Sequence, residues 1–292
     1  MSKKMPVVFV GHGTATMVLE DNEITKSLRE LGEEIVRRFG KPKGILAISA
    51  HWYAPGTYVQ GSESPKQVFD LSGVPAKMEE VQYTAVGDDH LTDEVLRLLG
   101  TQAQVNTVHG IDHGIWSVLR HLFPNADVPV VEMSVDASLS KQQIYQLAKK
   151  LAPLREEGYL IIASGNVVHN IREADWENDS GSDQTSEFVD AVVRLVNLRE
   201  DEALMAYEDL PHSSYAVPTP EHYLPLIYAL GASEGDSARV FNNEGKFGSV
   251  ALTGFVFGME DPTPAVAKEE TADDTKTPEQ KEPLEQSAKT AE

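Results

Sequence analysis

The chain has 292 residues, of which 41% are apolar, so it can bury a substantial core as one large domain or two small ones. Its formal net charge of −21 argues against broad contact with nucleic acid or with an anionic membrane surface. Cysteine is absent, which excludes disulfides, thiolate metal ligands and a cysteine nucleophile. No run approaches the roughly 18 consecutive apolar residues that a membrane-spanning helix needs.

The N-terminal sequence MSKKMPVVFVGHG has two lysines before an apolar stretch. That stretch, Pro6–Val10, is too short for the core of a signal peptide, and no small-residue cleavage site follows it. We therefore expect it to form the first strand of a cytoplasmic protein.

Strands and helices alternate along most of the chain. The next element is a helix, because residues 24, 28, 31, 35 and 39 are apolar and fall on one helical face, with Asn22 as a candidate N-cap. The further predicted strands are Ile45–Ile48, a short one near Tyr58, one near Val105, Val128–Val135, Tyr159–Ala163, one at Phe241, and Ser249–Phe257. The further predicted helices are Leu91–Leu99, Ile115–Phe123, Ser140–Leu151, Thr185–Val196 and Pro220–Leu230.

This alternation predicts a single α/β domain with a mostly parallel or mixed central sheet flanked by helices. In such sheets ligands bind at the C-terminal edge of the strands, so we expect the active site there. From Glu260 the composition changes to Glu, Lys, Thr, Pro and Ala, without an aromatic residue or an apolar period. The sequence therefore predicts a folded domain over residues 1–259 and a disordered acidic tail over residues 260–292.

Three histidines follow apolar runs that are broken by small residues. VVFVGHG places His12 between two glycines, and ILAISAHW places His51 just past the end of another strand. YLIIASGNVVHN places His169 four residues beyond Gly165. If the three strands are parallel neighbours, these imidazoles meet at one edge of the sheet. Without cysteine, such a cluster suits a labile Fe(II), Mn(II) or Zn(II) site.

Two more histidines lie at or just before the start of predicted helices. In VPTPEHYLPLIYALG, Thr219 is a candidate cap with Pro220 at the first helical position, so His222 is expected in the first turn. The positive end of the helix dipole lowers the pKa of an imidazole there and keeps it in the neutral form that binds metal. Glu221 is an alternative carboxylate ligand, and His113 in HGIDHGIWSVL lies at the start of another helix.

The other four histidines carry weaker signals. His90 and His121 lie in polar or helical surroundings and are interpreted as structural, whereas the roles of His109 and His212 are left open. Any one histidine is explained equally well by packing at the top of a sheet. The metal interpretation rests on the combination of several.

In this order, the segments GHG, SAHW, DHG, SGNVVHN and TPEHYLPL resemble the class III extradiol ring-cleavage dioxygenases. The similarity is greatest to the DODA-type (4,5-DOPA dioxygenase extradiol-like) branch of the LigB superfamily, which acts on DOPA-like catechols. The resemblance covers essentially the whole predicted domain and leaves the acidic tail outside.

The resemblance implies a role for each matching histidine. His12, His51 and His222 would be metal ligands. His169 would be the acid/base residue, or an added ligand when substrate is absent, and His113 would hydrogen-bond to substrate or bound oxygen. Better-studied relatives have a glutamate as third ligand, so the all-histidine set leaves the metal open: Fe(II) is needed for activity, while Zn(II) could occupy the site in a purified protein.

The implied reaction opens the ring of a catechol-type substrate with O₂ to give a semialdehyde acid. It needs no organic cofactor, and the chain has no convincing dinucleotide or phosphate-binding glycine fingerprint. The expected partners are a small aromatic diol and O₂, with no nucleic acid and no membrane, and the expected state is a monomer or small homo-oligomer. DOPA, an alkyl catechol, protocatechuate, gallate and an aminophenol all stay open as substrates.

Two other functions compete with this one. A zinc hydrolase would use the same histidines to activate water, although the HExxH motif of many peptidases is absent. A non-catalytic protein would keep the fold as a binding module and would not use the site for a reaction. Four convergent imidazoles count against that module, because a site no longer used has no physical reason to retain them.

Overall fold

A mixed sheet organises the fold in a computed structural model that describes residues 3–70, 76–78 and 80–259. Within these residues the sheet has eight strands in the order β4-β3-β5-β2-β6-β1-β10-β7, and a separate pair is formed by β8 and β9. The strands are β1 (Val7–Gly11), β2 (Ile45–Ala54), β3 (Thr57–Gln60), β4 (Ala103–Asn106), β5 (Val130–Asp136), β6 (Leu160–Gly165), β7 (Ala238–Phe241), β8 (Gly245–Lys246), β9 (Val250–Ala251) and β10 (Gly254–Phe257).

The four central strands β5, β2, β6 and β1 run parallel to one another. On one side β10 pairs antiparallel with β1 and β7 with β10, and on the other β3 pairs antiparallel with β5. Strands β1, β5 and β6 are buried along their whole length, as their apolar runs predict for strands covered on both faces. The predicted α/β fold with a mixed sheet is confirmed.

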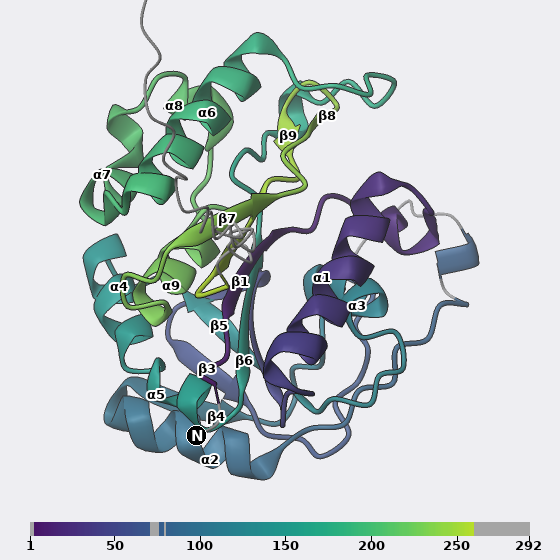
Figure 1. Cartoon of the computed structure of the whole chain (residues 1–292), viewed down its shortest axis with the longest axis vertical. Coiled ribbons are helices and arrows are strands. Elements are labelled where there is room, and N and C mark those ends of the chain that lie inside the picture. Colours follow the sequence, from purple (N-terminus) through teal and green to yellow (C-terminus); the bar gives the residue numbers. More distant parts are fainter. Residues whose placement is uncertain (1–2, 71–75, 79, 260–292) are drawn as a thin grey trace, which may run out of the picture. The chain divides into compact units, whose positions relative to one another are not determined.

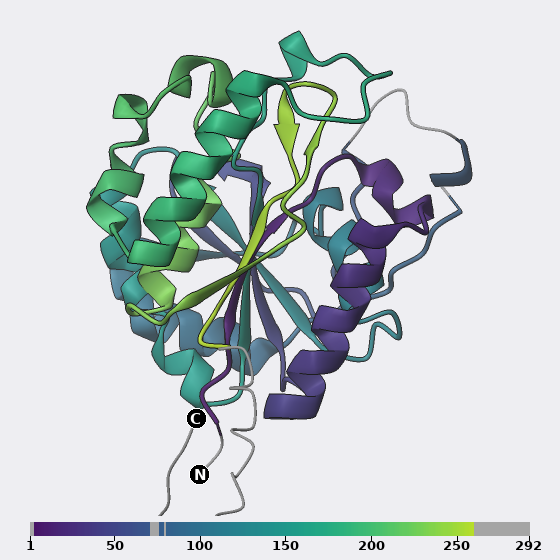
Figure 2. The same cartoon turned by 45° about the horizontal axis from the view of Figure 1, so that its top comes forward.

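Helices cover both faces of this sheet, with α1 and α3 on one side and α4, α6 and α9 on the other (Figures 1 and 2). The α-helices are α1 (Glu23–Phe39), α2 (Asp89–Leu99), α3 (His113–Leu122), α4 (Lys141–Lys149), α5 (Pro153–Glu156), α6 (Asp183–Leu198), α7 (Asp201–Met205), α8 (Ser213–Ala216) and α9 (Leu224–Ala232). The short 3₁₀ helices are η1 (Ala15–Leu19), η2 (Ala76–Met78), η3 (Gly100–Gln102), η4 (Ile171–Glu173) and η5 (Tyr207–Asp209).

Each face of the sheet has its own apolar core because strand side chains alternate. In β1, Val7 and Phe9 belong to the core beneath α4 and α9, whereas Val8 and Val10 belong to the core beneath α1 and α3. Helix α1 begins where its sequence predicts, since the Asn22 side chain accepts the backbone N–H of Thr25.

Two predictions next to the site are wrong. Strand β2 continues to Ala54, so His51 lies inside the strand and not past its end. The reason is a shift of register against β5 between Ser49 and Tyr53, an irregularity that re-aims side chains without ending the strand.

The second wrong prediction concerns the start of α9, which begins at Leu224, so His222 precedes the helix. The Thr219 hydroxyl donates to the Glu221 carboxylate instead of capping the helix. The backbone carbonyl of His222 accepts the N–H of Asn166, which ties this turn to the end of β6.

Other differences from prediction are smaller. The predicted strand Ser249–Phe257 is divided into β9 and β10. The predicted acidic tail, residues 260–292, lies outside the described residues. None of the helices in the described part of the chain combines the length and the apolar character that crossing a bilayer requires.

Candidate metal centre

Five histidines from different parts of the chain converge at the carboxyl edge of the central strands. His12 follows β1, His51 lies in β2, His113 begins α3, His169 follows β6 and His222 precedes α9. The ring centres lie 4.9 Å apart for His12 and His51, 3.8 Å for His51 and His113, 5.3 Å for His12 and His222, 5.1 Å for His51 and His222, and 3.4 Å for His169 and His222. The structure thus brings together every histidine that the sequence analysis assigned to the site.

The possible ligand atoms of this region form two groups, each with all its atoms within 4.8 Å of one another. The first group is His12, His51 and His113, and the second is His169, Glu221 and His222. The predicted ligand set of His12, His51 and His222 therefore draws on both groups.

Hydrogen bonds determine which nitrogen of His12 carries its proton. The Ser164 hydroxyl donates to the carbonyl of Gly114 at 2.6 Å, so its oxygen accepts from Nδ1 of His12 at 2.9 Å. Nε2 of His12 therefore keeps a free lone pair. Burial, helped by the neighbouring histidines, lowers the pKa of His12 well below its ordinary value, so this imidazole is neutral.

Asp70 holds two of the imidazoles, and the sequence analysis missed it. Its carboxylate accepts from Nδ1 of His113 at 2.6 Å and lies 3.2 Å from Nδ1 of His51. Burial alone would raise the pKa of Asp70, but the hydrogen bonds from these two histidines outweigh it and hold that pKa far below its ordinary value. Both rings therefore donate from Nδ1 and leave Nε2 free.

His222 offers a further free nitrogen. Its Nδ1 lies 3.4 Å from Oε1 of Glu221, and its Nε2 is buried without a hydrogen-bond partner among the described residues. Burial lowers the pKa of His222 despite the adjacent Glu221, so the ring is neutral. An unpartnered buried nitrogen is costly in a folded protein, which is a reason to look for a ligand that it would bind.

The arrangement of His12 and His51 points to a cation between them. Their Nε2 atoms lie 3.2 Å apart, and neither carries a proton when both Nδ1 atoms donate, so no hydrogen bond joins them. Two ligand nitrogens on one ion with bonds of about 2.1 Å are separated by roughly 3.0–3.4 Å. The donor set therefore fits a divalent metal ion.

Comparisons with known proteins give this geometry a context. Residues 6–257 match the family model described as the catalytic LigB subunit of aromatic ring-opening dioxygenase. The chain belongs to the LigB family. It is 37% identical over 264 residues to 4,5-DOPA dioxygenase extradiol of Escherichia coli (strain K12), a match that covers 88% of this chain and 96% of that protein.

Two further comparisons agree with the first. The chain is 32% identical over 255 residues to 4,5-DOPA dioxygenase extradiol of Beta vulgaris, covering 85% of this chain and 95% of that protein. The crystal structure of an uncharacterized protein from Escherichia coli K12 superimposes with a TM-score of 0.74 at 35% identity, covering 87% of this chain and 100% of that one. This LigB-family chain is therefore an aromatic ring-opening dioxygenase, and the alternatives of a zinc hydrolase and a non-catalytic module are set aside.

His169 stands beside the candidate ligands of this dioxygenase in the neutral form. Its ring stacks on His222 with only 9° between the planes, and its backbone N–H donates to the carbonyl of Ala216. Burial first, and then the nearby His222, lowers the pKa of His169 to about 3. A neutral imidazole at this place can accept a proton.

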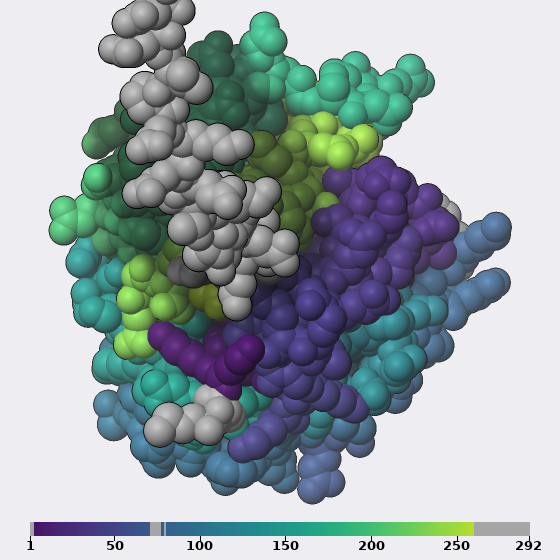
Figure 3. Space-filling model, in the orientation of Figure 1, coloured from purple at the N-terminus to yellow at the C-terminus, as the bar shows by residue number. Residues whose placement is uncertain are grey.

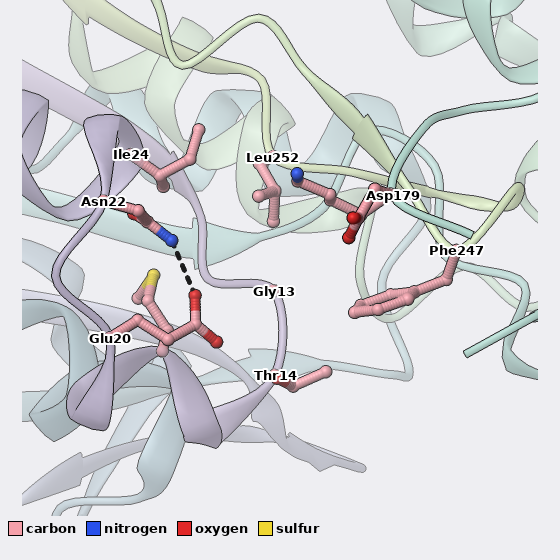
Figure 4. A pocket seen from close by; sticks show the side chains of 10 residues that line it. Gly13, Thr14, Glu20, Asn22, Ile24, Asp179, Phe247 and Leu252 are labelled. Atoms are coloured by element: carbon pink, nitrogen blue, oxygen red, sulfur yellow. Dashed lines mark hydrogen bonds between the residues drawn. The ribbon is translucent and has the colours of Figure 1, made fainter. Parts of the chain in front are cut away.

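A cavity of about 270 Å³ is lined by Gly13, the residue after His12. It is bounded by the segment from Gly13 to Ile24 and by Phe247 and Leu252 (Figure 4). On the molecular surface the same two regions, at the start of α1 and around β8, meet in the space-filling view (Figure 3). None of the five clustered histidines lines this cavity.

The remaining histidines of the LigB-family chain lie elsewhere. His121 bonds to the carbonyl of Met17 and His90 packs near Tyr159, in keeping with structural roles. His212 pairs with Glu187 away from the cluster. His109, left open by the sequence, stacks on Trp52 with ring centres 3.8 Å apart.

Proposed function

We propose that this dioxygenase opens the ring of a DOPA-type catechol by extradiol cleavage with O₂, using Fe(II) held by His12, His51 and His222. The observation that carries the proposal is the set of three imidazoles whose Nε2 atoms are left free by partners at Nδ1. The substrate class rests on the relatives named 4,5-DOPA dioxygenase extradiol. The product expected from this cleavage is a semialdehyde acid.

Fe(II) bound by three protein ligands would have open positions for both catechol oxygens and for O₂. The chain's own residues would do the rest. Neutral His169 is in the protonation state to take a proton from a catechol hydroxyl. Because Nδ1 of His113 donates to Asp70, its Nε2 can accept a hydrogen bond from a substrate hydroxyl.

Further assignments stay predictions from the sequence. These are a cytoplasmic location and a monomeric or small homo-oligomeric state. Zn(II) is expected to compete with Fe(II) for the same imidazoles in a purified protein, because imidazole suits both ions.

The test combines metal content with ring-fission absorbance. The wild-type protein, loaded anaerobically with Fe(II), is expected to turn over L-DOPA when O₂ is admitted. Its turnover of L-DOPA is compared with that of protocatechuate, an alkyl catechol and 2-aminophenol. His51→Ala should lose one equivalent of Fe(II) per chain and the activity, with its circular dichroism unchanged. His212→Ala, which changes a histidine away from the cluster, should keep both. Full iron retention in His51→Ala would remove His51 from the ligand set, and wild-type protein inactive on every catechol would refute the reaction.

A further inference from the structure

A second group of metal-ligating side chains lies outside the five-histidine cluster. It consists of His109, Asp112 and Glu132, whose ligand atoms all lie within 4.8 Å of one another. Nε2 of His109 is 3.1 Å from Oε1 of Glu132 and 4.0 Å from Oδ2 of Asp112. The function proposed above uses none of these three residues.

Two carboxyl groups are deeply buried in this group. Glu132 lies in the middle of β5 opposite Ala47 of β2 and is 0% exposed, and Asp112 is 1% exposed. Burying a carboxylate is costly unless a positive charge or several hydrogen bonds compensate for the lost water. Within the described part of the chain, Oδ2 of Asp112 has no hydrogen-bond partner.

The other oxygens of the two carboxyl groups are already occupied. Oε2 of Glu132 accepts the backbone N–H of Asp112 at 3.1 Å, and Oδ1 of Asp112 accepts the Ser49 hydroxyl at 2.8 Å. Oδ2 of Asp112 is left without a partner among the described residues, and Oε1 of Glu132 lies in hydrogen-bonding contact with Nε2 of His109 at 3.1 Å. The chain thus presents two carboxylate oxygens and one imidazole nitrogen to a common point.

His109 does not supply the missing positive charge. Burial lowers its pKa, and this outweighs the opposite effect of Asp112, so the ring is neutral near pH 7. Burial also raises the pKa of Glu132 to about 8 and, together with the charge of Glu132, raises that of Asp112. Among the residues that the structure describes, the carboxyl pair therefore has no neighbouring counter-charge, and it would bind either a proton or a cation.

We propose that His109, Asp112 and Glu132 form a second metal site, for a divalent first-row ion such as Mn(II) or Zn(II). Separations of 3.1 and 4.0 Å fit donors on one ion with bonds of about 2.1 Å, for which neighbouring and opposite ligands lie roughly 3.0 and 4.2 Å apart. Carboxylate oxygens with one imidazole are a donor set that these ions accept.

The site has a route to solvent and a link to the first cluster. The His109 side chain is 22% exposed, so an ion can enter from its side. The Ser49 hydroxyl that donates to Asp112 also accepts the backbone N–H of His51 at 3.2 Å. A bound ion would therefore hold in place the segment that leads into α3 and the bulged part of β2.

Metal counting tests the proposal, with Zn(II) as the probe. Protein stripped by a chelator is dialysed against micromolar Zn(II), freed of loose ion and measured by mass spectrometry of the metal. We expect wild-type protein to retain one Zn(II) per chain more than Glu132→Gln, which keeps the shape of the side chain but removes its charge. His109→Ala should lose the same ion. Because His109 is partly exposed, this variant tests the second site if Glu132→Gln does not fold. His212→Ala is the control and should match wild type.

The two metal sites are separated by a further variant. His51→Ala should lose the ion of the first cluster only, so its melting temperature should still rise with Zn(II). Adding Glu132→Gln to the His51→Ala protein should abolish that rise. Equal Zn(II) content in wild type, Glu132→Gln and His109→Ala would overturn the second site and leave a shared proton between the carboxyl groups. If His51→Ala keeps the ion of the first cluster, the ligand assignment of that cluster fails. The difference in Zn(II) content between wild type and Glu132→Gln still decides whether the second site exists.

Discussion

Single residues decide the direction in which each imidazole of the site offers its lone pair. Asp70 binds Nδ1 of both His51 and His113, and Ser164 binds Nδ1 of His12. Such partners set the tautomer and hold the ring in place. The chemistry of the cluster therefore depends on residues that would not themselves touch a metal.

Asp70→Asn tests this dependence. An amide has one acceptor oxygen and no charge, so it can no longer hold both rings as donors from Nδ1. We expect Fe(II) affinity to fall about 10- to 100-fold, the usual effect of losing such a partner, with the fold retained. Anaerobic titration measures the affinity, and Asp209→Asn, at an exposed carboxylate, is the matched control. An unchanged affinity would show that Asp70 does not orient the ligands.

His169→Gln separates two roles for this residue. As an acid/base residue, it should leave Fe(II) content and catechol binding intact while turnover falls roughly 100- to 10,000-fold. As a ligand, it should instead weaken Fe(II) binding by at least about tenfold. We favour the first outcome, because three imidazoles already suffice as ligands. His90→Gln, at an exposed histidine, should change neither quantity, and normal turnover with full iron in His169→Gln would leave His169 a structural residue.

Among the elements, the end of β6 fixes the position of the turn before α9. A Cβ atom on Gly165 would come within 2.2 Å of the carbonyl oxygen of His222, so only glycine permits this approach. Gly165→Ala should cost about 1–3 kcal/mol of unfolding free energy, as overpacking usually does, and should lower Fe(II) affinity by displacing His222.

The matched control for this element is Gly100→Ala. Gly100 has φ +59° and open space around its added Cβ, so alanine there strains the backbone without touching the site. Its melting temperature should fall while its Fe(II) affinity stays at the wild-type value. A Gly165→Ala protein that also kept wild-type Fe(II) affinity would contradict the coupling between β6 and His222.

The elements with strong apolar periods could be predicted from sequence, and those set by tertiary contacts could not. Strand β1 and helix α1 follow directly from apolar runs and a capping asparagine. The irregularity in β2 depends on its register with β5, and the start of α9 depends on the bond between Asn166 and His222. In both cases the contacting residues are far apart in sequence, so local propensity cannot predict these two features.

The same contrast holds for the site. The histidines lie in sequence segments that can be recognised, and the structure brings the five assigned histidines together. Asp70 lies in a stretch without apolar period, and Glu132 is a carboxylate flanked by apolar residues within strand β5. Their positions beside imidazoles are products of the fold, which explains why the sequence analysis named neither.

At the scale of the whole molecule, buried neutral imidazoles make the metal-free protein sensitive to acid. Burial lowers the pKa of His12 and His222 and brings that of His169 to about 3, whereas each would be near 6.5 in the unfolded chain. At a pH between the folded-state and unfolded-state pKa of such a histidine, the unfolded state binds more protons than the folded state. The free energy of unfolding therefore decreases as pH falls.

Urea unfolding of the chelator-treated protein from pH 7 to pH 5 measures this effect. Each such histidine contributes up to about 1.4 kcal/mol per pH unit to the slope. His169→Gln should therefore show a shallower loss of stability than wild type over the same range. Identical slopes in the two proteins would mean that His169 titrates alike in the folded and unfolded states.

The position of β1 has a consequence for how the chain is made. This strand lies between β6 and β10, so its two partners come from residues 160–165 and 254–257. On the ribosome, β1 therefore emerges well before β6 and β10, and its second edge is covered only after β10 has been made. Pairing over such distances is slow and leaves apolar strands open in the meantime. Nascent chains of this protein should therefore be clients of chaperones until Phe257 has left the exit tunnel.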